Sequence, residues 1–457
     1  MKRALLAMAL CVLVHGAEKE TPPEGSAPRP FHLAKTEDFT LPNGMKVTIV
    51  PYGVVPKVAV TAYVQAGALY EPADQVWISK LTAKLMQEGT SSRTSDQLAS
   101  DVADMGGQLE IGSGSDFMTA GGEVLSDSGA RFIAVLADVL KDPALPASQI
   151  DRLKKDLGRD LAVDKSTPQS LARERFLQVL YPDHPYGRVF PTPAALGGYT
   201  IEQVRAFYAG NFSAGRTHLY VAGKLEPGLK EAIQTNFGDW KAGTASSEKP
   251  PAGTKTHSVQ AIDRPGAAQS TLYMGLPVLS PSSPDYVPED VMNALLGGSF
   301  ASRITSNIRE QKGYTYSPFS MIGTMGRSAY WAEVADVTTA VTGPSLKEIF
   351  GEIDRLRREA PKSPELRGIQ TYLSGLFVLR NTISATGVIS QLHFVDAQGL
   401  DRSYLTSYVR RVNEVKAEDI QRLAETELVP SKMTVVVVGD LSKIGDQLKP
   451  YQQPAEP

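Results

Sequence analysis

An internal repeat places the strongest constraint on how this chain can fold. Residues Thr200–Leu225 and Lys416–Leu441 align without a gap at a constant offset (416 − 200 = 216). In each copy a short amphipathic helix leads into a hydrophobic strand that ends on a glycine, Gly223 in the first copy and Gly439 in the second. A matched order of helix, turn, strand and glycine is typical of a duplicated unit. The repeat therefore predicts two similar domains.

The length of the chain agrees with this organisation. A single hydrophobic core seldom grows beyond about 250–300 residues, and this chain has 457. Residues 242–257 (AGTASSEKPPAGTKTH) have the Gly, Ser and Pro content of a linker. We expect one domain at 36–241, this linker, a second domain at 258–448 and a tail at 449–457.

Strand patterns and helix patterns come in groups within each half. In the first half, the strand patterns cover 45–51, 58–67, 108–111 and 116–124, and the last two can pair across a Gly/Ser turn. Helical periodicity covers 94–105, 127–140, 147–164 and 170–180. Such groups predict an α+β fold, in which each domain is a mostly antiparallel sheet with helices packed on one face.

The first residues have the pattern of a signal peptide. A basic start is followed by Ala4–Val14, an apolar run of about eleven residues that is too short to span a bilayer, and then by small residues suited to cleavage. We expect residues 1–17 to be removed and residues 18–35, with their four prolines, to be a flexible lead-in. The mature protein is therefore expected to be exported, to the periplasm in a bacterium.

Composition argues against several other functions. The net charge of −3 gives no electrostatic basis for binding nucleic acid or an anionic membrane. No later apolar run is long enough for a transmembrane segment. The only cysteine, Cys11, lies in the signal peptide, so no thiol chemistry is expected in the mature chain. The chain also has no Gly-x-Ser-x-Gly elbow and no recognisable carboxylate dyad, which argues against a self-contained hydrolase of another kind.

The stretch 77–90 (WISKLTAKLMQEGT) follows a predicted buried strand and is itself a predicted helix. Ile78, Leu81 and Leu85 recur on one face, and Gly89 supplies a stop. A strand with small residues at its end, then an apolar helix closing on Glu-Gly-Thr, resembles the site helix of the pitrilysin or insulinase family of zinc peptidases. In that family the helix carries His-x-x-Glu-His, in which two imidazoles bind zinc and the glutamate activates water.

The resemblance implies that the zinc site of the family is lost in this chain. The three motif positions hold Lys80, Ala83 and Lys84, and two ammonium groups on one helix face repel a divalent cation. The family's third ligand is a downstream glutamate, for which the nearest match is Asp160. One carboxylate without imidazoles does not hold zinc, so we expect no metal here. Asp160 is then a helix-surface residue or an ion-pair partner of Lys80 or Lys84, and the two lysines alone also fit a solvated helix face.

The segment 295–317 (LLGGSFASRITSNIREQKGYTYS) carries a second match to the same family. It begins with a Gly-Gly turn, after which Ser299 is placed to cap a helix that ends at Gly313. Phe300, Ile304 and Ile308 would line one face of that helix. The whole segment resembles closely the signature of the family's second domain.

The resemblance also gives roles to residues in this segment. In active members an arginine and a tyrosine seven residues apart reach the scissile peptide, and Arg309 and Tyr316 have this spacing (316 − 309 = 7). A guanidinium and a phenol are donors suited to the substrate carbonyl and its oxyanion. Gly297, Gly298 and Ser299 are candidates for substrate binding. The alternative is that Arg309 only complements the helix dipole and that Tyr316 packs in a strand.

The resemblance covers about residues 36–448 and implies half of a clamshell. We expect a zinc-less subunit of an exported heterodimeric peptidase, whose Arg309 and Tyr316 complete the active site of a homologous partner that holds the zinc. The pair would enclose unfolded peptides, bound partly by strand addition to an edge within 108–124. The alternative is an inert scaffold or peptide-binding protein of the same fold, in which Arg309 and Tyr316 are relics.

Overall fold

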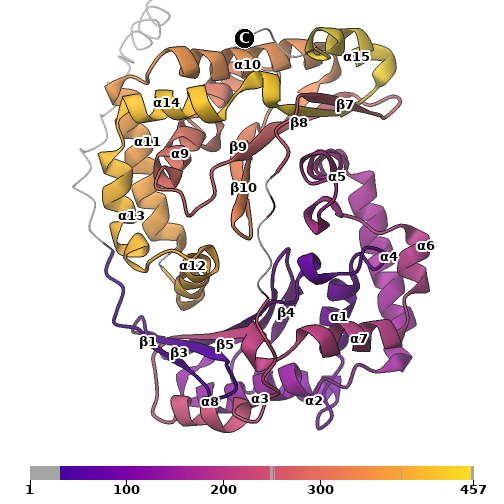
Figure 1. Cartoon of the computed structure of the whole chain (residues 1–457), viewed down its shortest axis with the longest axis vertical. Helices are drawn as coiled ribbons and strands as arrows, with labels where there is room; N and C mark the ends of the chain where they lie inside the picture. The colour runs from indigo at the N-terminus through magenta and orange to yellow at the C-terminus, as the bar shows by residue number, and fades with distance from the viewer. Residues whose placement is uncertain (1–30, 247–250, 252, 382, 454–457) are drawn as a thin grey trace, which may run out of the picture.

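The chain folds into two α+β domains, as its sequence predicts. The computed structural model describes residues 31–246, 251, 253–381 and 383–453. The predicted signal peptide lies outside these residues, as do most of the lead-in and parts of the linker and tail. In Figure 1 the N-terminal domain, coloured indigo to magenta, lies below the C-terminal domain, coloured orange to yellow.

A six-stranded sheet in the order β1-β2-β6-β3-β5-β4 forms the centre of the first domain. All neighbouring strands are antiparallel except β2 and β6. The strands are β1 (Glu37–Thr40), β2 (Lys46–Pro51), β3 (Lys57–Val64), β4 (Glu110–Ser113), β5 (Met118–Leu125) and β6 (Thr217–Gly223). The predicted hairpin is present, with β4 at the edge of the sheet.

Most helices of this domain lie where helical periodicity is predicted, with shifted ends, and two further helices were not predicted. The helices are α1 (Ile78–Met86), α2 (Ser95–Ala103), α3 (Gly129–Lys141), α4 (Ile150–Ser166), α5 (Pro168–Leu180), α6 (Pro193–Gly198), α7 (Ile201–Asn211) and α8 (Leu229–Phe237). Thr94 and Thr200 begin α2 and α7 with capping boxes, each of which satisfies amides of the first turn. The apolar faces of α1, α3 and α4 contribute to a single core with one face of the sheet.

The second domain repeats this plan on a five-stranded sheet in the order β7-β11-β8-β10-β9. Its strands are β7 (Ser258–Asp263), β8 (Gln269–Val278), β9 (Phe319–Met325), β10 (Ser328–Thr338) and β11 (Thr434–Gly439). Its α-helices are α9 (Tyr286–Asn293), α10 (Thr342–Arg358), α11 (Ser363–Leu376), α12 (Ala385–Gln398), α13 (Ser403–Glu414), α14 (Ala417–Glu427) and α15 (Leu441–Leu448).

The repeat in the sequence corresponds to a repeat in the structure. Its first copy forms α7 and β6, and its second copy forms α14 and β11. Strand β6 is parallel to β2 and antiparallel to β3, while β11 is parallel to β7 and antiparallel to β8. The two strands therefore hold equivalent places in the two sheets, which confirms the predicted pair of similar domains.

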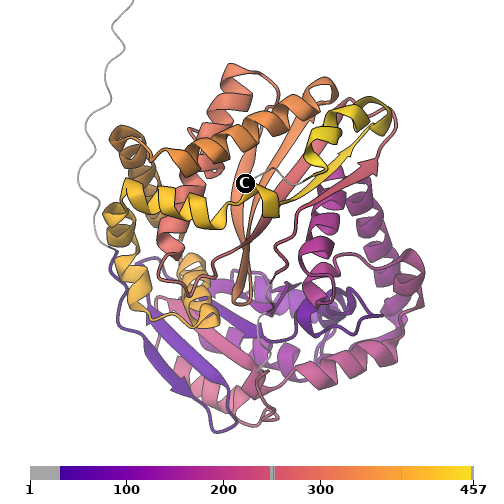
Figure 2. The ribbon, with the colours of Figure 1, turned by 45° about the horizontal axis from the view of Figure 1, so that its top comes forward.

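One helix of each domain also packs against the sheet of the other domain, which the sequence did not predict. Helix α5 packs against β8 and β11, and α12 packs against β3 and β6 (Figures 1 and 2). Phe176 of α5 lies 4.8 Å from Tyr273 between ring centroids, and His393 of α12 stacks on Tyr63 at 3.5 Å. Helices thus cover one face of each sheet from its own domain, and a single helix from the other domain reaches the second face.

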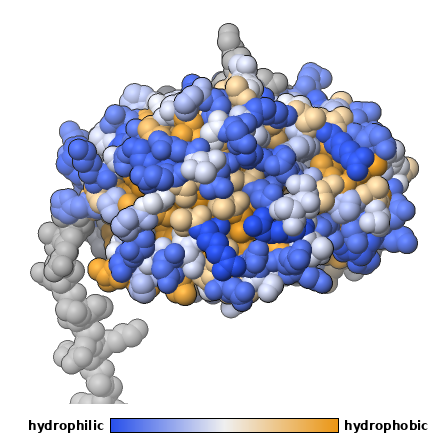
Figure 3. All heavy atoms as spheres, turned by 90° about the horizontal axis from the view of Figure 1, so that it is seen from below, coloured by the Kyte–Doolittle hydropathy of each residue, from blue (hydrophilic) through white to orange (hydrophobic). Residues whose placement is uncertain are grey.

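The described surface gives no sign of a membrane-spanning helix. Among the residues that the structure describes, no helix is both long and apolar enough to cross a bilayer. The face seen from below in Figure 3 is largely hydrophilic, and its hydrophobic residues gather in small patches between polar ones.

Candidate functional site

A buried carboxylate fixes the start of α1, the helix for which the sequence predicts correspondence to the family's site helix. Glu71 accepts hydrogen bonds from the amides of Trp77 (2.9 Å) and Ser79 (3.0 Å) and from the Ser79 hydroxyl (2.5 Å). Ser113, at the end of β4, donates to the same hydroxyl (2.7 Å). These bonds hold Trp77 at a φ of 74°, a left-handed conformation that non-glycine residues rarely adopt. The helix therefore begins at Ile78, one residue later than predicted.

The two lysines of α1 diverge. Lys84 points outward, and its Nζ lies 3.6 Å from Oδ2 of Asp160 on α4, with both side chains substantially exposed. This confirms the ion pair that was one of the expectations for Asp160. Lys80 turns inward, and its Nζ lies 3.6 Å from the centroid of the Trp77 ring. Burial lowers the pKa of Lys80, an effect that the charges of Asp164 and Glu71 partly oppose.

The residues at the four positions that the resemblance aligns with the family's zinc site do not suit zinc. Two ammonium groups and the buried methyl group of Ala83 offer no ligand, and the remaining carboxylate, Asp160, is engaged with Lys84. Nowhere in the described part of the chain do three His, Cys, Asp or Glu side chains gather in a way that could hold a metal ion. That the purified protein contains no zinc stays a prediction, for which metal analysis is the measurement.

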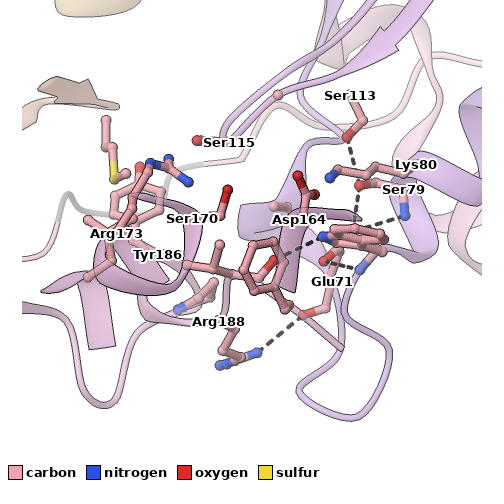
Figure 4. A pocket seen from close by; sticks show the side chains of 18 residues that line it. Glu71, Ser79, Lys80, Ser113, Ser115, Asp164, Ser170, Arg173, Tyr186 and Arg188 are labelled. Atoms are coloured by element: carbon pink, nitrogen blue, oxygen red, sulfur yellow. Dashed lines mark hydrogen bonds between the residues drawn. The ribbon is translucent and has the colours of Figure 1, made fainter. Parts of the chain in front are cut away.

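A cavity of about 290 Å³ opens beside Lys80 (Figure 4). Its walls come from α1, α4, α5, the turn between β4 and β5, and the short helix at Pro185–Gly187, and one side chain of the second domain, Met325, also lines it. Lys80 and Arg173 reach into it from opposite sides, with Ser115, Ser170 and Asp164 between them (Figure 4).

A polar link between the domains fixes one wall of this cavity. The Asp116 carboxylate, in the turn between β4 and β5, accepts hydrogen bonds from the Tyr186 hydroxyl and from the amide of Gly326 (2.9 Å) in the second domain. Burial raises the pKa of Asp116, although these donors favour its charged form. Residues of both domains therefore bound the cavity, and hydrogen bonds to the buried Asp116 carboxylate join the two domains beside it.

The Arg309 segment differs from its predicted form. Ser299 does not cap a helix, and no described residue bonds its buried hydroxyl. The helical turns resume only after Ser302, whose hydroxyl accepts from the amide of Thr305 (3.3 Å), and Thr305–Gln311 has the wider π-helical winding. Ile304 and Ile308 are buried as predicted, but Phe300 is 68% exposed because the chain turns between the two helical pieces.

Arg309 and Tyr316 come together at the surface with Phe300. The Arg309 guanidinium carbon lies 4.5 Å from the centroid of the Phe300 ring and 4.9 Å from that of Tyr316. The Arg309 Nε is 3.2 Å from a carboxylate oxygen of the neighbouring Glu310, whose side chain is largely exposed. Tyr316 is 79% exposed and precedes β9, so it does not pack in a strand. The spacing of seven residues thus corresponds to a contact between the two side chains.

Gly297 and Gly298 are required by packing. A Cβ at Gly297 would lie 2.5 Å from Oε2 of Glu333 and 2.6 Å from the Ser320 hydroxyl, and one at Gly298 would lie 2.6 Å from Nδ2 of Asn293. Gly297 and Ser299 are also buried. A role of these three residues in substrate binding stays a prediction.

Most residues of the cavity were not predicted from the sequence. Arg173 and Asp164 belong to helices that were predicted only as packing units, and both line the cavity because α4 packs against α1 and α5 packs against α4. Glu71 carried a weak signal, since an acidic residue shortly before a helix is typical of an N-terminus.

Two family descriptions cover most of the chain. Residues 49–193 match the family described as Insulinase (Peptidase family M16), and residues 198–373 match the Peptidase M16 inactive domain. An uncharacterized zinc protease of Rickettsia felis is 22% identical over 357 residues, which are 78% of this chain and 85% of that protein. An uncharacterized zinc protease of Mycobacterium leprae is 22% identical over 434 residues, which are 93% of this chain and 95% of that protein.

Solved structures show the same fold. A peptidase M16 inactive domain from Pseudomonas fluorescens superposes with a TM-score of 0.82 at 23% identity, covering 88% of this chain and 98% of that one. A protease from Helicobacter pylori gives a TM-score of 0.80 at 18% identity, covering 89% and 100%. With its two matched domains in this order, the chain belongs to the M16 peptidase family, the insulinase family.

Proposed function

We propose that this protein is the zinc-less subunit of a heterodimeric M16 peptidase. Its Arg309 and Tyr316 would act on a peptide held at the zinc of a homologous partner subunit. The supporting observation is an asymmetry within the chain. The metal positions carry groups that do not bind zinc, whereas the arginine and tyrosine lie in contact at the surface, where a second protein can reach them.

The contacts of Phe300 and Tyr316 with Arg309 suit a hydrogen-bond donor that is already held in position. The rings of Phe300 and Tyr316 both lie against the Arg309 guanidinium, and each such contact contributes about 0.5–1 kcal/mol at an exposed site. The ion pair with Glu310 is made through Nε, and the planar fork has further N–H donors. Arg309 can therefore donate to the carbonyl oxygen of a bound peptide, and the Tyr316 phenol is a second donor beside it.

In this proposal the chemistry is divided between two chains. The partner's metal site supplies the activated water. Arg309 and Tyr316 stabilise the negative charge that develops on the peptide oxygen, a contribution that is larger in the transition state than in the ground state. Peptides are the proposed substrate because the relatives are named zinc proteases. The signal-peptide pattern of residues 1–17 supports an exported, periplasmic location.

The test is mutation of this cluster in the pair reconstituted with a zinc-bearing homologue. We expect Arg309→Ala to lower kcat about 10²–10³-fold, as loss of an oxyanion donor does elsewhere, and Tyr316→Phe to have a smaller effect. The matched control is Lys312→Ala, which removes a cation of the same segment that pairs with Glu348 at 3.4 Å and should leave turnover unchanged.

Size-exclusion chromatography separates a loss of catalysis from a loss of assembly. Each variant should co-elute with the partner as the wild-type chain does. Full turnover by the Arg309→Ala pair would contradict the proposal and favour an inert scaffold in which Arg309 and Tyr316 are relics.

A further inference from the structure

Two cations reach into the cavity beside α1 without a hydrogen bond or an ion pair to any described residue. The Lys80 ammonium lies over the face of the Trp77 ring, at 3.6 Å from its centroid, and the Arg173 guanidinium reaches into the cavity from the other side (Figure 4). A partly buried arginine of the second domain, by contrast, is paired. The side chain of Arg303 is 9% exposed and makes two bonds to the carboxylate of Glu365, at 2.7 and 2.9 Å. The cavity therefore contains two cations that form no direct ion pair with a described carboxylate.

The charges that line the cavity leave room for one more anion. Lys80, Arg173 and Arg188 carry three positive charges, and Glu71 and Asp164 carry two negative ones, so the lining has a net charge of 3 − 2 = +1. Both carboxylate oxygens of Glu71 already accept hydrogen bonds from amides at the start of α1. Burial lowers the pKa of Lys80, the charges of Asp164 and Glu71 partly oppose this effect, and the nearby charge of Arg173 lowers the pKa further. A bound carboxylate would offset the effects of burial and of Arg173.

The other groups in the cavity match a carboxylate on an extended chain. The hydroxyls of Ser115 and Ser170 lie between the two cations (Figure 4) and can donate to an anion. The volume of about 290 Å³ is near the lower limit of ligand pockets, so it admits one chain end or one side chain and not a folded partner. Trp77 and Phe190, with ring centroids 5.9 Å apart, give a neighbouring side chain an aromatic surface.

The position of the cavity points to a peptide as the source of that carboxylate. Ser113 is the last residue of the edge strand β4 and also lines the cavity. A peptide that paired with this edge would run toward Lys80 and Arg173. The start of α1 is also rigid, because Glu71 fixes it through three donors.

We propose that the cavity beside α1, in place of the lost zinc site, binds the carboxylate of a peptide between Lys80 and Arg173, with Ser115 and Ser170 as further donors. The carboxylate is that of the peptide's C-terminus or of an acidic side chain. The site anchors one part of a peptide and performs no chemistry. It rests on the proposed function only in taking peptides as the natural ligand.

The experiment measures binding by this chain alone, without a partner subunit. The probes are three N-acetylated, unlabelled alanine-rich hexapeptides, titrated by isothermal calorimetry at about 0.1 M salt, where charges are screened beyond roughly 10 Å. One has a free C-terminal carboxylate, one is C-terminally amidated, and one is amidated but carries an internal glutamate. We expect at least one carboxylate peptide to bind at least tenfold more tightly than the amidated peptide without glutamate.

Variants then locate the bound carboxylate. Lys80→Gln and Arg173→Gln should each weaken binding of the carboxylate peptide at least tenfold. The matched controls are Lys84→Gln, one turn along α1, and Arg175→Gln, on an exposed face of α5, where Arg175 donates to Gln260. Each control removes the same charge from the same helix and should leave binding within about twofold of wild type. Thermal melts confirm that every variant is folded.

Each result decides for or against the site. Preference for the free C-terminus supports a terminal anchor, and preference for the glutamate peptide supports a side-chain anchor. Equal binding of the fully amidated peptide, no binding of any probe, or equal losses in the variants and their controls would overturn the inference. A failure here with a positive result for Arg309→Ala in the reconstituted pair would leave the subunit role intact, so the two proposals fail separately.

Discussion

Apart from the additional edge strand β1 in the first domain, the two sheets have corresponding strand orders, but the helices that follow β3 and β8 differ in form. In the first domain β3 leads to α1, a regular helix whose start is held by a carboxylate with three donors. In the second, β8 leads to α9, which continues into a π-helical turn and breaks at Ser299. The helix then resumes, and its π-helical piece Thr305–Gln311 contains Arg309. Windings of this kind are frequent at functional sites.

Buried carboxyl groups sharpen the same contrast. Glu71 in the first domain accepts three hydrogen bonds, whereas neither oxygen of Glu333 in the second has a partner among the described residues. From the part of the chain that the structure describes, Glu289, also in the second domain, accepts only the long bond from the amide of Leu279 (3.4 Å). A duplicated fold thus fixes the sheet and its helices, while the polar groups built into it have diverged.

The largest expected effect concerns Glu289. Burial raises its pKa to about 8, against 4.5 in an unfolded chain. Between these values the folded protein keeps a proton that the unfolded chain has lost, so stability is fully present below pH 4.5 and falls as the pH rises to about 8. The difference of 3.5 corresponds to about 4 kcal/mol at pH 8. Urea unfolding followed by tryptophan fluorescence should show this decline.

Glu289→Gln should remove this pH dependence, because the amide does not titrate. At pH 5 the variant should be about 1–2 kcal/mol less stable than wild type, since its buried NH₂ group lacks an acceptor. At pH 8 the order should reverse. Two stability curves that run parallel from pH 5 to pH 8 would contradict the contrast between the domains.

The next effect concerns Glu71. Glu71→Ala leaves two amides and one hydroxyl of α1 without their acceptor and should lower the free energy of unfolding of the first domain by about 3 kcal/mol. Glu110→Ala, an exposed glutamate of the same domain, is the control and should cost less than about 0.5 kcal/mol. Denaturant unfolding compares the two, and equal losses would mean that Glu71 does not hold α1.

The smallest effect belongs to the ion pair between Lys84 and Asp160, at positions that the resemblance aligns with zinc ligands. The side chains of Lys84 and Asp160 are 38% and 57% exposed, and pairs of this kind contribute about 0–1 kcal/mol. Asp160→Asn should therefore change the melting temperature by no more than about 2 °C in a protein of this size. A loss several times larger would show that the pair is a structural substitute for the metal.

The sequence predicted the fold well because its signals are local. Strand alternation, helical periodicity and the repeat at 200–225 and 416–441 are each read within short windows, and the structure forms those elements in those places. Arg309 and Tyr316 were singled out through the family resemblance and their spacing of seven residues, whereas the contact between their side chains was not predicted.

The errors and omissions have physical causes that no local pattern contains. Ser299 does not cap a helix because Gly297 and Gly298 draw the chain against Glu333 and Asn293, so that the helix resumes only beyond Ser302. The exchange of α5 and α12 between the sheets, and the cavity that α5 helps to build, depend on contacts between distant segments. Such contacts are decided by the packing of whole domains.

The most direct test of the central claim is peptidase activity on an unstructured fluorogenic peptide. The chain without residues 1–17 is assayed alone, beside the zinc-bearing homologue alone, and after the two are mixed at increasing ratios. We predict no turnover by this chain, little by the homologue, and chelator-sensitive turnover that saturates at equimolar mixing. Turnover by this chain alone, after metal analysis has excluded a contaminating protease, or an equimolar mixture no more active than the homologue by itself, would contradict completion of a shared active site.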